Sequence, residues 1–429
     1  MTTAQLSVTF FLQMFVILAT CRVVGWVGKK HFHQPQVVGE MIAGVILGPS
    51  LFGLLAPEVQ QMVFPAESKG ILYVGAQLGV GLYMFLVGLG FRGDHFRANA
   101  HKAAAVSISG MAAPFVVALV ITPWLMSVPG LFSETASRFD ATLFMGAAIA
   151  ITAFPMLARI IHERGLSHTA LGTLSLSAGA IDDAAAWCVL ALVLASFGAG
   201  AGVAVTAILG GAIFATTLIF LGPKLLAPLG RMAERDQALG RPLSSLLLSL
   251  TLMLFMLSAF TADAIGLHAV FGGFLLGTVM PRGALSEQVK RLLEPFTVVL
   301  LLPMFFTYSG LNTQLTMVNS LELLLIALAI LACSILAKFG ACWAAARACG
   351  QDNRTALGIG ALMNSRGLME LIIINIGLQA GVIGPALFSM LVLMAIVTTL
   401  MASPLFEWVY GRRARADGEL EALQKSADI

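Results

Sequence analysis

Six charged side chains lie far inside apolar stretches of the sequence, and these are the groups with which it could do chemistry. They are Glu40, Asp182, Asp183, Lys338, Arg366 and Glu370. A lone ionised side chain at the centre of a bilayer costs at least about 2.5–3.5 kcal/mol on insertion scales, so each one needs a partner or a function. Carboxylates beside an ammonium group could bind a small cation and a proton in turn.

The adjacent pair Asp182 and Asp183 lies deep in an apolar run that starts near Thr169. At 1.5 Å per residue of helix, the pair is about 20 Å from the start of this run, which is beyond the reach of snorkelling. Successive helix residues point about 100° apart, so the two carboxylates cannot both face one small pocket from the same side. We therefore expect one aspartate to hold a partner while the other faces a cavity.

The four other charges at depth also need partners or an accessible position. Lys338 lies well inside its own run, and its natural partner is one of the two aspartates, because an unpaired buried ammonium group tends to lose its proton. Arg366 and Glu370 are spaced i, i+4 and can neutralise each other on one helix face, either as a structural brace or in direct contact with an ion. Glu40 lies only a few residues inside its run, where an interfacial position is also open.

The charge balance of this set suggests an exchange mechanism. With Arg366 and Glu370 cancelling, two aspartates and one lysine leave a net charge of −1, which one monovalent cation or one proton could neutralise. Hard carboxylate oxygens suit Na⁺, Li⁺ or K⁺. Competition between ion and proton at a site that opens to each side in turn is sufficient for exchange. If cation binding also makes Lys338 release a proton, two protons would move per ion and the cycle would be electrogenic.

The elements that must position these groups are membrane helices. Of the 429 residues, 58% are hydrophobic and only 11% are charged, whereas soluble domains carry about a quarter charged residues. Apolar runs of about 20 residues recur, each long enough to cross a bilayer as a helix, and the alternating pattern of a membrane β-barrel is missing. We predict an all-α polytopic protein with about thirteen runs. They start near Leu6, Pro35, Ile71, Ala103, Ala141, Thr169, Gly202, Ser244, Leu267, Pro295, Leu321, Thr355 and Ala386.

The basic residues predict the orientation of these runs. Most of the 25 Lys and Arg residues fall in the odd-numbered loops and in the tail, while the even-numbered loops hold only Lys69 and Arg138. By the positive-inside rule the N-terminus lies outside and the tail is cytoplasmic. We therefore expect a multi-pass protein of the cell membrane, of the bacterial inner-membrane type, with one transporter unit over residues 1–410 and a short cytoplasmic tail over residues 411–429.

Two runs contain polar breaks at matched positions. The fifth run contains Thr152-Ala153-Phe154-Pro155, and the twelfth contains Asn364-Ser365-Arg366-Gly367. Because these runs are seven apart, they have opposite orientations in the membrane, as expected of an inverted repeat with paired broken helices. Transporters use such breaks around a site near the bilayer midplane, whereas a single break would merely kink a helix.

The chain resembles a known family at these same residues. The stretches Pro35–Ser50, Ile151–Arg159, Ser177–Asp183 and Met363–Leu371 are similar to motifs of the monovalent cation/proton antiporters of the second branch of that superfamily, near the plant-type cation/proton exchangers and their bacterial relatives. The resemblance implies a homodimer in which a core domain moves like an elevator past a dimerisation domain. The core would include residues 71–126, 141–196, 295–311 and 355–378.

The resemblance also implies roles for individual residues. Asp183 would be the main ion-binding carboxylate, with Asp182 as the partner of Lys338 and both aspartates able to ligate the transported cation. The crossing of the broken helices would involve Thr152, Pro155, Asn364, Arg366 and Glu370. The double aspartate is similar to that of electrogenic members, while many plant-type exchangers have Asn-Asp there.

Buried carboxylates in membrane helices also serve other functions. The leading prediction is exchange of Na⁺ or Li⁺ for H⁺; K⁺/H⁺ exchange and proton-coupled transport of an organic anion are alternatives. An intramembrane aspartyl protease would need its aspartates on separate helices, and no Tyr-Asp dipeptide exists here. A midplane lysine would oppose the rapid cation flow of a channel. We expect no enzymatic activity, no cofactor and no nucleic-acid partner, and we read the five cysteines as buried packing residues.

The glycine spacings Gly44-x-x-x-Gly48 and Gly75-x-x-x-Gly79 are a further feature of the apolar runs. Such spacings let helices approach closely, and they could form contacts between subunits. In glycine-rich membrane helices they more often mark packing within one chain, which is what we predict here.

Overall fold

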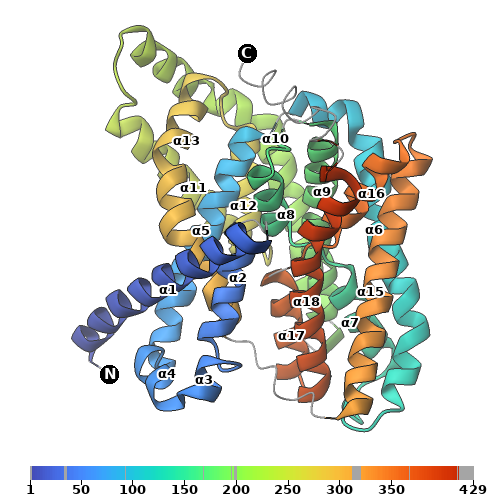
Figure 1. The fold of residues 1–429 in the computed structure, drawn as a ribbon. Helices are drawn as coiled ribbons and strands as arrows, with labels where there is room; N and C mark the ends of the chain where they lie inside the picture. The colour runs from blue at the N-terminus through green and yellow to red at the C-terminus, as the bar shows by residue number, and fades with distance from the viewer. Residues whose placement is uncertain are drawn as a thin grey trace.

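A computed structural model gives the architecture of the chain (Figure 1). It describes residues 2–32, 36–91, 93–167, 169–194, 196–197, 201–311, 320–366, 368–412 and 414. Most of the predicted tail, residues 411–429, lies outside the described residues. Over the described part the chain is helical, and the β-structure there is an isolated bridge between Phe132 and Ile383.

The helices fall into two packing groups. The first group, around α2, α5, α12 and α14, consists of α1 (Thr3–Phe32), α2 (Gln36–Leu47), α3 (Phe52–Leu55), α4 (Pro57–Val63), η1 (Ala66–Ser68), α5 (Lys69–Gly90), α10 (Ala201–Ala238), α11 (Ser245–Ala264), α12 (Ala269–Val279), α13 (Ala284–Phe296), η3 (Thr297–Leu301) and α14 (Leu302–Leu311). The second group, around α6, α9 and α15, consists of α6 (Gly93–Met126), α7 (Arg138–Ala150), α8 (Phe154–Glu163), α9 (Ala170–Leu194), α15 (Leu321–Ala348), α16 (Asn353–Met363), α17 (Leu368–Gln379), α18 (Pro385–Phe406) and η4 (Glu407–Gly411).

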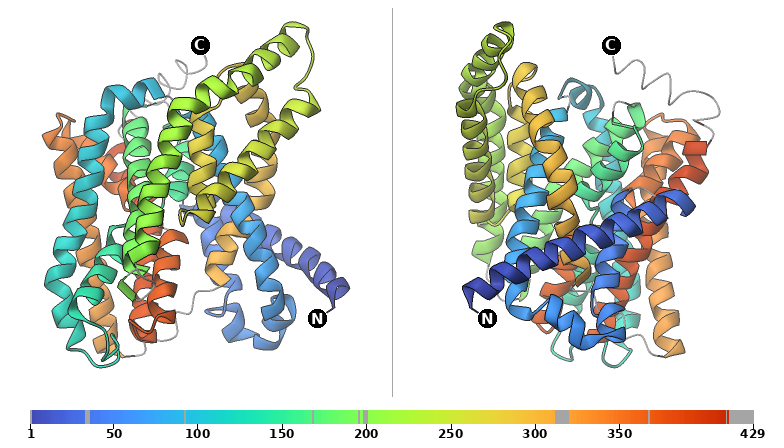
Figure 2. Two further views of the ribbon diagram at one scale, coloured as in Figure 1. Left: turned by 180° about the vertical axis from the view of Figure 1, so that it is seen from behind. Right: turned by 60° about the vertical axis from the view of Figure 1, so that its left-hand side comes forward.

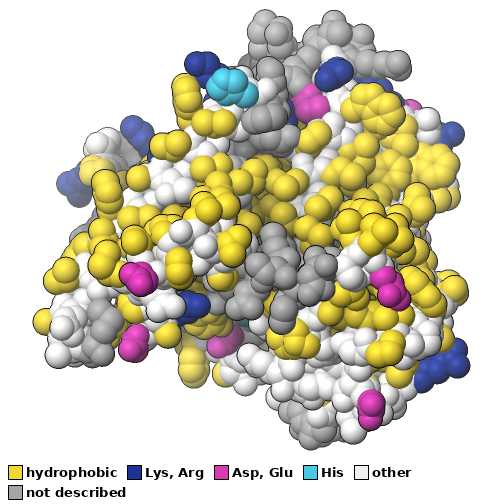
Figure 3. All heavy atoms as spheres, turned by 60° about the horizontal axis from the view of Figure 1, so that its bottom comes forward, with side chains coloured by type: hydrophobic (Ala, Val, Ile, Leu, Met, Phe, Trp, Pro, Cys, Tyr) yellow, Lys and Arg dark blue, Asp and Glu magenta, His cyan; other side chains and the backbone are white. Residues whose placement is uncertain are grey.

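The predicted polytopic all-α class is confirmed. Within the described residues, nine helical segments are long and apolar enough to cross a membrane. The other four predicted runs fall on α9, on α12, on the continuous α13–η3–α14 segment and on the interrupted α16–α17 segment. Figure 3 shows a face on which hydrophobic side chains cover broad areas and charged side chains are scattered between them.

The two packing groups divide the chain differently from the predicted core and dimerisation domains. The predicted core includes the residues of α5 and α14, but α5 packs against α12 and α14, and α14 also packs against α2. Conversely, α15 was not placed in the core, yet it packs against α6 and α16. The division into a moving domain and a static domain stays a prediction.

Close backbone contacts hold the first group together. A side chain at Gly44 would meet the backbone of Phe306 and Thr307 at 2.8 Å, and one at Gly48 would meet the Gly310 carbonyl at 2.6 Å. The second glycine pair behaves alike, because a side chain at Gly79 would lie 2.7 Å from Leu301. These glycines therefore let α2 and α5 pack directly on η3 and α14, and the predicted packing within one chain is confirmed.

Helix α10 is longer than a bilayer requires. Its 38 residues correspond to about 57 Å, whereas the hydrocarbon core is about 30 Å thick. Figure 2 shows the end of this helix projecting beyond the rest of the bundle, next to the start of α11. In Figure 1, α1 starts near the lower edge of the bundle, while α18 ends towards the upper edge.

Candidate functional site

Two interrupted helices meet at the centre of the second group. Helix α7 ends at Ala150 and α8 starts at Phe154; α16 ends at Met363 and α17 starts at Leu368. Figure 1 shows α7 and α17 towards the lower side of the bundle and α8 and α16 towards the upper side, so the two segments run in opposite directions. The α7–α8 segment and the α16–α17 segment are therefore each interrupted where they cross.

The sequence explains where the first break falls. Pro155 occupies the first turn of α8, where its missing N–H group costs nothing. A proline also disfavours the helical conformation of the residue before it. The polar backbone exposed by the breaks then finds partners in the other segment: Ala153 N–H donates to Ser365 O at 3.0 Å, and Thr152 Oγ1 donates to Met363 O at 3.1 Å.

Asp182 is the most heavily bonded carboxylate at this crossing. Lys338 Nζ lies 2.8 Å from its Oδ2 atom, and Thr152 Oγ1 donates to the same oxygen at 2.7 Å. Ser107 Oγ of α6 donates to Oδ1 at 2.5 Å. The side chains of Asp182 and Lys338 have no exposed surface. Hydrogen bonds to an ionised carboxylate are among the stronger ones, and here they join α6, α9, α15 and the first break.

Two cationic side chains also bind the end of α7. Lys338 Nζ donates to Ala150 O, and Arg366 Nη1 donates to Ala148 O at 3.0 Å. These carbonyls belong to the last turn of α7, which has no following helical turn to provide donors. The break thus depends on side chains from α15 and from the second break.

Arg366 is the largest fully buried side chain among the described residues. Its Nη1 atom lies 3.2 Å from Glu370 Oε1, and Nη2 donates to Ser334 Oγ. Thr399 of α18 accepts from the Arg366 N–H at 3.0 Å and donates to its carbonyl at 2.9 Å. The i, i+4 pair expected from the sequence is therefore present and embedded in contacts with α7, α15 and α18.

The structure brings the other predicted site residues to the same place. Asp183 follows Asp182 on α9 and is 3% exposed. Asn364, in the second break, is fully buried and donates to Gly360 O at 3.1 Å. Gly367, predicted as part of that break, lies outside the described residues. The functional roles of these residues remain predictions.

The sequence left an interfacial position open for Glu40, and its depth in the membrane stays a prediction. Its side chain is 3% exposed, because α2 lies between α1 and α14 and contacts α8. It does not join the group around Asp182, and its surroundings are a separate pocket described below.

Sequence reasoning missed the neutral members of the site. Ser334 is four residues before Lys338 on α15, and this i, i+4 spacing to a buried charge is a signal that would have found it. Ser107 and Thr399 lie in apolar runs with no charged neighbour at helical spacing, so nothing in the sequence distinguishes them. The backbone acceptors Ala148 and Ala150 become visible only when the break is built.

The described groups form a compact site with carboxylate and carbonyl oxygens at depth. Asp182, Asp183 and Glu370 carry three negative charges when ionised, and Lys338 and Arg366 carry two positive charges. The site as a whole is then left with one negative charge. An alkali cation or a proton at a carboxylate would balance it, and such oxygens are the ligands that hard cations prefer. This is a polytopic membrane transporter with paired broken helices around a buried charged site.

Comparisons with known proteins agree with this class. A model of the family described as sodium/hydrogen exchanger, transmembrane, matches residues 15–410. The chain therefore belongs to the sodium/hydrogen exchanger family, and the predicted resemblance to cation/proton antiporters is confirmed.

The names of similar proteins refer to different transported ions. The Na⁺/H⁺ antiporter NhaS4 of Synechocystis is 38% identical over 92% of this chain and 96% of its own length. The cation/H⁺ antiporter 18 of Arabidopsis thaliana is 33% identical over 95% of this chain, and the K⁺/H⁺ antiporter 1 of Saccharomyces cerevisiae is 32% identical over 98% of it. The chain spans about half the length of these plant and yeast relatives.

Proposed function

We propose that this protein is a secondary antiporter that exchanges a monovalent cation, Na⁺ or Li⁺ by preference, for H⁺ by alternating access. The observation that carries the proposal is the fully buried pair of Asp182 and Lys338, beside Asp183, at the crossing of two broken helices. A buried charged cluster of this kind is costly in a membrane and marks an ion or proton pathway.

The geometry supports different roles for the two aspartates. Asp182 accepts hydrogen bonds from Ser107 and Thr152 and is paired with Lys338, so its oxygens are already occupied. Asp183 is the neighbouring carboxylate on the same helix, and we assign to it the binding of the transported cation and of a proton in turn. Its substitution by asparagine removes the charge and leaves the shape almost unchanged.

A second proton fits the same site. In this structure Lys338 is bound to Asp182. We propose that a cation recruits Asp182 as a further ligand, which frees Lys338 to release a proton. Each cycle would then move two protons against one monovalent ion and carry net charge. Arg366 and Glu370 would stay paired and hold the second break in place.

The choice of cation rests on the double aspartate and on the names of relatives. The double aspartate and the name of the cyanobacterial relative support Na⁺, while the name of the yeast relative supports K⁺/H⁺ exchange as the alternative. Proton-coupled transport of an organic anion is a further alternative, in which Arg366 would bind the carboxylate of the anion. Arg366 already binds Glu370, Ser334 and Ala148 O, which disfavours that alternative.

For the whole molecule we propose a homodimer in the cell membrane of the bacterial inner-membrane type. The N-terminus would lie outside and the tail in the cytoplasm, following the distribution of Lys and Arg. We assign the moving part to the second packing group, which carries the charged site, and the static dimerising part to the first. We propose transport and no enzymatic reaction.

Currents on solid-supported membranes test this proposal. Proteoliposomes should give a transient current when Na⁺, Li⁺ or K⁺ is applied in turn, and the order of the currents ranks the ions. Asp183→Asn should abolish the response. Asp263→Asn removes an exposed carboxylate at the end of α11 and should leave it intact. Normal exchange in the Asp183 variant would contradict the assignment of the site.

A further inference from the structure

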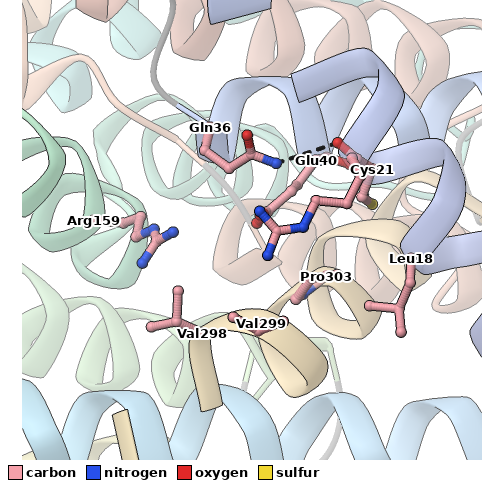
Figure 4. A pocket seen from close by; sticks show the side chains of 9 residues that line it. Leu18, Cys21, Gln36, Glu40, Arg159, Val298, Val299 and Pro303 are labelled. Atoms are coloured by element: carbon pink, nitrogen blue, oxygen red, sulfur yellow. Dashed lines mark hydrogen bonds between the residues drawn. The ribbon is translucent and has the colours of Figure 1, made fainter. Parts of the chain in front are cut away.

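A second polar pocket lies between the two packing groups, away from the crossing of the broken helices. It has a cavity volume of about 30 Å³ and is formed by α1, α2 and α8, with apolar side chains of η3 and α14 on one side. Its polar lining comes from Cys21, Arg22, Gln36, Glu40 and Arg159. Figure 4 shows the carboxylate of Glu40 and the guanidinium of Arg159 turned towards the same space.

Glu40 is an unusual member of this pocket. Its side chain is 3% exposed, and within the described part of the chain its Oε2 atom is buried without a hydrogen-bond partner. A buried carboxylate oxygen with no donor is strongly destabilised when ionised, since water no longer solvates it. The oxygen therefore requires a proton, a cation or a mobile cationic side chain.

The lining of the pocket favours a proton over a metal cation. Arg22 on α1 and Arg159 on α8 repel either one, but a proton needs only the Glu40 oxygen, whereas a metal cation needs several oxygen ligands and the described lining offers a single carboxylate. Glu163 on α8 and Tyr83 on α5 are also within electrostatic range, whereas η3 and α14 contribute apolar residues to the lining. Cys21 Sγ is directed to Glu40 O and Thr307 Oγ1 and does not occupy the carboxylate.

Arg159 links this pocket to a contact between the packing groups. Its Nε atom lies 2.6 Å from Glu163 Oε1, and the other carboxylate oxygen of Glu163 accepts the backbone N–H of Gln36 at 2.5 Å. Gln36 is the first residue of α2, so Glu163 of α8 caps the N-terminus of a helix in the other group. An ionised Glu40 would compete with Glu163 for the guanidinium of Arg159, whereas a neutral Glu40 would not.

We propose that Glu40 is a second proton-binding site, separate from Asp182 and Asp183, and that its charge state controls how firmly α8 holds the N-terminus of α2. With Glu40 protonated, Arg159 remains with Glu163 and the contact to Gln36 is kept. With Glu40 ionised, Arg159 turns towards it and the contact between the groups weakens. Proton binding at Glu40 does not depend on ion exchange at Asp183.

Infrared difference spectra of the reconstituted full chain over a pH titration test this site. A buried protonated carboxyl group gives a C=O band that disappears when the group ionises. One such band should be lost in Glu40→Gln and kept in Glu58→Gln, which alters an exposed glutamate of α4. It should also remain in Asp183→Asn and be insensitive to Na⁺ in that variant.

The outcomes separate this inference from the proposed function. An unchanged set of bands in Glu40→Gln would overturn the proton site, and loss of the Glu40 band on addition of Na⁺ would show a cation site instead. If Glu40→Gln fails to fold, Glu40→Asp keeps a carboxyl group and should shift the pH at which the band disappears. Failure of the transport proposal would leave the Asp183→Asn spectrum, and therefore this test, unaffected.

A second experiment tests whether the charge of Glu40 controls the contact between Glu163 of α8 and the N-terminus of α2. Thermal melting of the wild-type protein should contain a pH-dependent step that is missing in Glu40→Gln, with the variant behaving at all pH values as the wild type does at acid pH. Arg159→Met should remove the same step, because the group for which Glu40 and Glu163 compete is gone. Persistence of the step in both variants would overturn the proposed link to α2.

Discussion

The Lys338 side chain contacts two different elements of the site, α7 and α9. Its ammonium group binds Asp182 of α9 and the carbonyl at the end of α7, while Ser334, one turn away on α15, binds Arg366 of the second break. Because these groups are fully buried, removing one of them leaves charges that water cannot solvate. Substitution of one of these buried charged residues is therefore expected to lower stability strongly.

Lys338→Ala should lower the free energy of unfolding by about 3–5 kcal/mol, because it leaves Asp182 as a buried charge without its counter-charge. Melting in detergent measures this loss, and the combined variant Lys338→Ala with Asp182→Asn should regain part of it. Lys224→Ala on α10 removes an exposed lysine and should change stability by less than about 0.5 kcal/mol. An unchanged melt together with an unchanged H⁺:ion ratio would count against the pairing.

Thr152→Val should destabilise the crossing by about 1–3 kcal/mol, since it removes the hydroxyl group that lies within hydrogen-bond distance of both Asp182 and Met363 O. The matched control is Thr251→Val. Thr251 is equally buried, but its hydroxyl donates to Leu247 O, a carbonyl within its own helix. The two melts should therefore differ clearly, and equal melts would mean that the contact between the breaks contributes little.

The charged part of the site was predictable because ionised residues are rare at depth and each demands a partner. That reasoning led to Asp182, Lys338 and the pair of Arg366 and Glu370, all of which the structure places together. It could not predict that the Glu40 side chain is buried within the protein, since this depends on how far α1 and α14 cover α2. It also could not find Ser107, because a serine in an apolar run carries no signal of its partner.

At the scale of elements, glycine contacts decide how closely the helices of the first group pack. Gly44→Ala should destabilise the protein by about 1–3 kcal/mol, because the added methyl group would meet the backbone of α14, which cannot move aside easily. Gly340→Ala is the control: it lies inside α15 with open space around it and should stabilise by up to about 1 kcal/mol. Melting of both variants checks the prediction, and equal effects would contradict it.

The N-terminus of α16 offers a prediction on pH. Although burial favours the neutral form, hydrogen bonds from the Thr355 side chain and nearby backbone N–H groups outweigh it and lower the pKa of Asp352 below its ordinary value. Its stabilisation is therefore present at neutral pH and is lost as the pH falls below about 4. Asp352→Ala should cost about 1 kcal/mol at neutral pH.

The control for this cap is Glu322→Ala in the first turn of α15. It removes an acidic charge near a helix N-terminus where Ser320, and not Glu322, provides the cap. Melting curves at several pH values should show the deficit of Asp352→Ala disappearing in acid. A deficit that is independent of pH, or one shared fully by Glu322→Ala, would argue against the capping bond as its cause.

The broken helices were predictable, whereas the grouping of helices was not. Pro155 and the polar residues around it identify the first break, because they cannot continue a helix in an apolar run. The grouping depends on which apolar faces pack together, and these faces look alike in sequence. The packing of α5 against α12 and α14, and of α15 against α6 and α16, is therefore visible only in the structure.

For the whole molecule, the release of a second proton by Lys338 predicts an electrogenic cycle. If two protons exchange for one ion, a membrane potential that is negative inside should drive protons inwards and speed the efflux of Na⁺ from proteoliposomes. A potassium diffusion potential set with valinomycin provides this condition, and liposomes without the ionophore are the control. A rate of Na⁺ efflux that is independent of the potential would show an electroneutral exchange.

The helix ends at the crossing also create an electric field that does not change with pH. Peptide dipoles place about half a negative charge at the C-terminal ends of α7 and α16 and about half a positive charge at the N-terminal ends of α8 and α17, and all four ends lie at the crossing, with Lys338 and Arg366 bonded to the end of α7. Protonation of every carboxylate would thus still leave Lys338 and Arg366 facing the dipole of α7. The backbone can keep the crossing assembled while the side chains exchange ions and protons, so that the chemistry of the cycle is separated from the cohesion of the site.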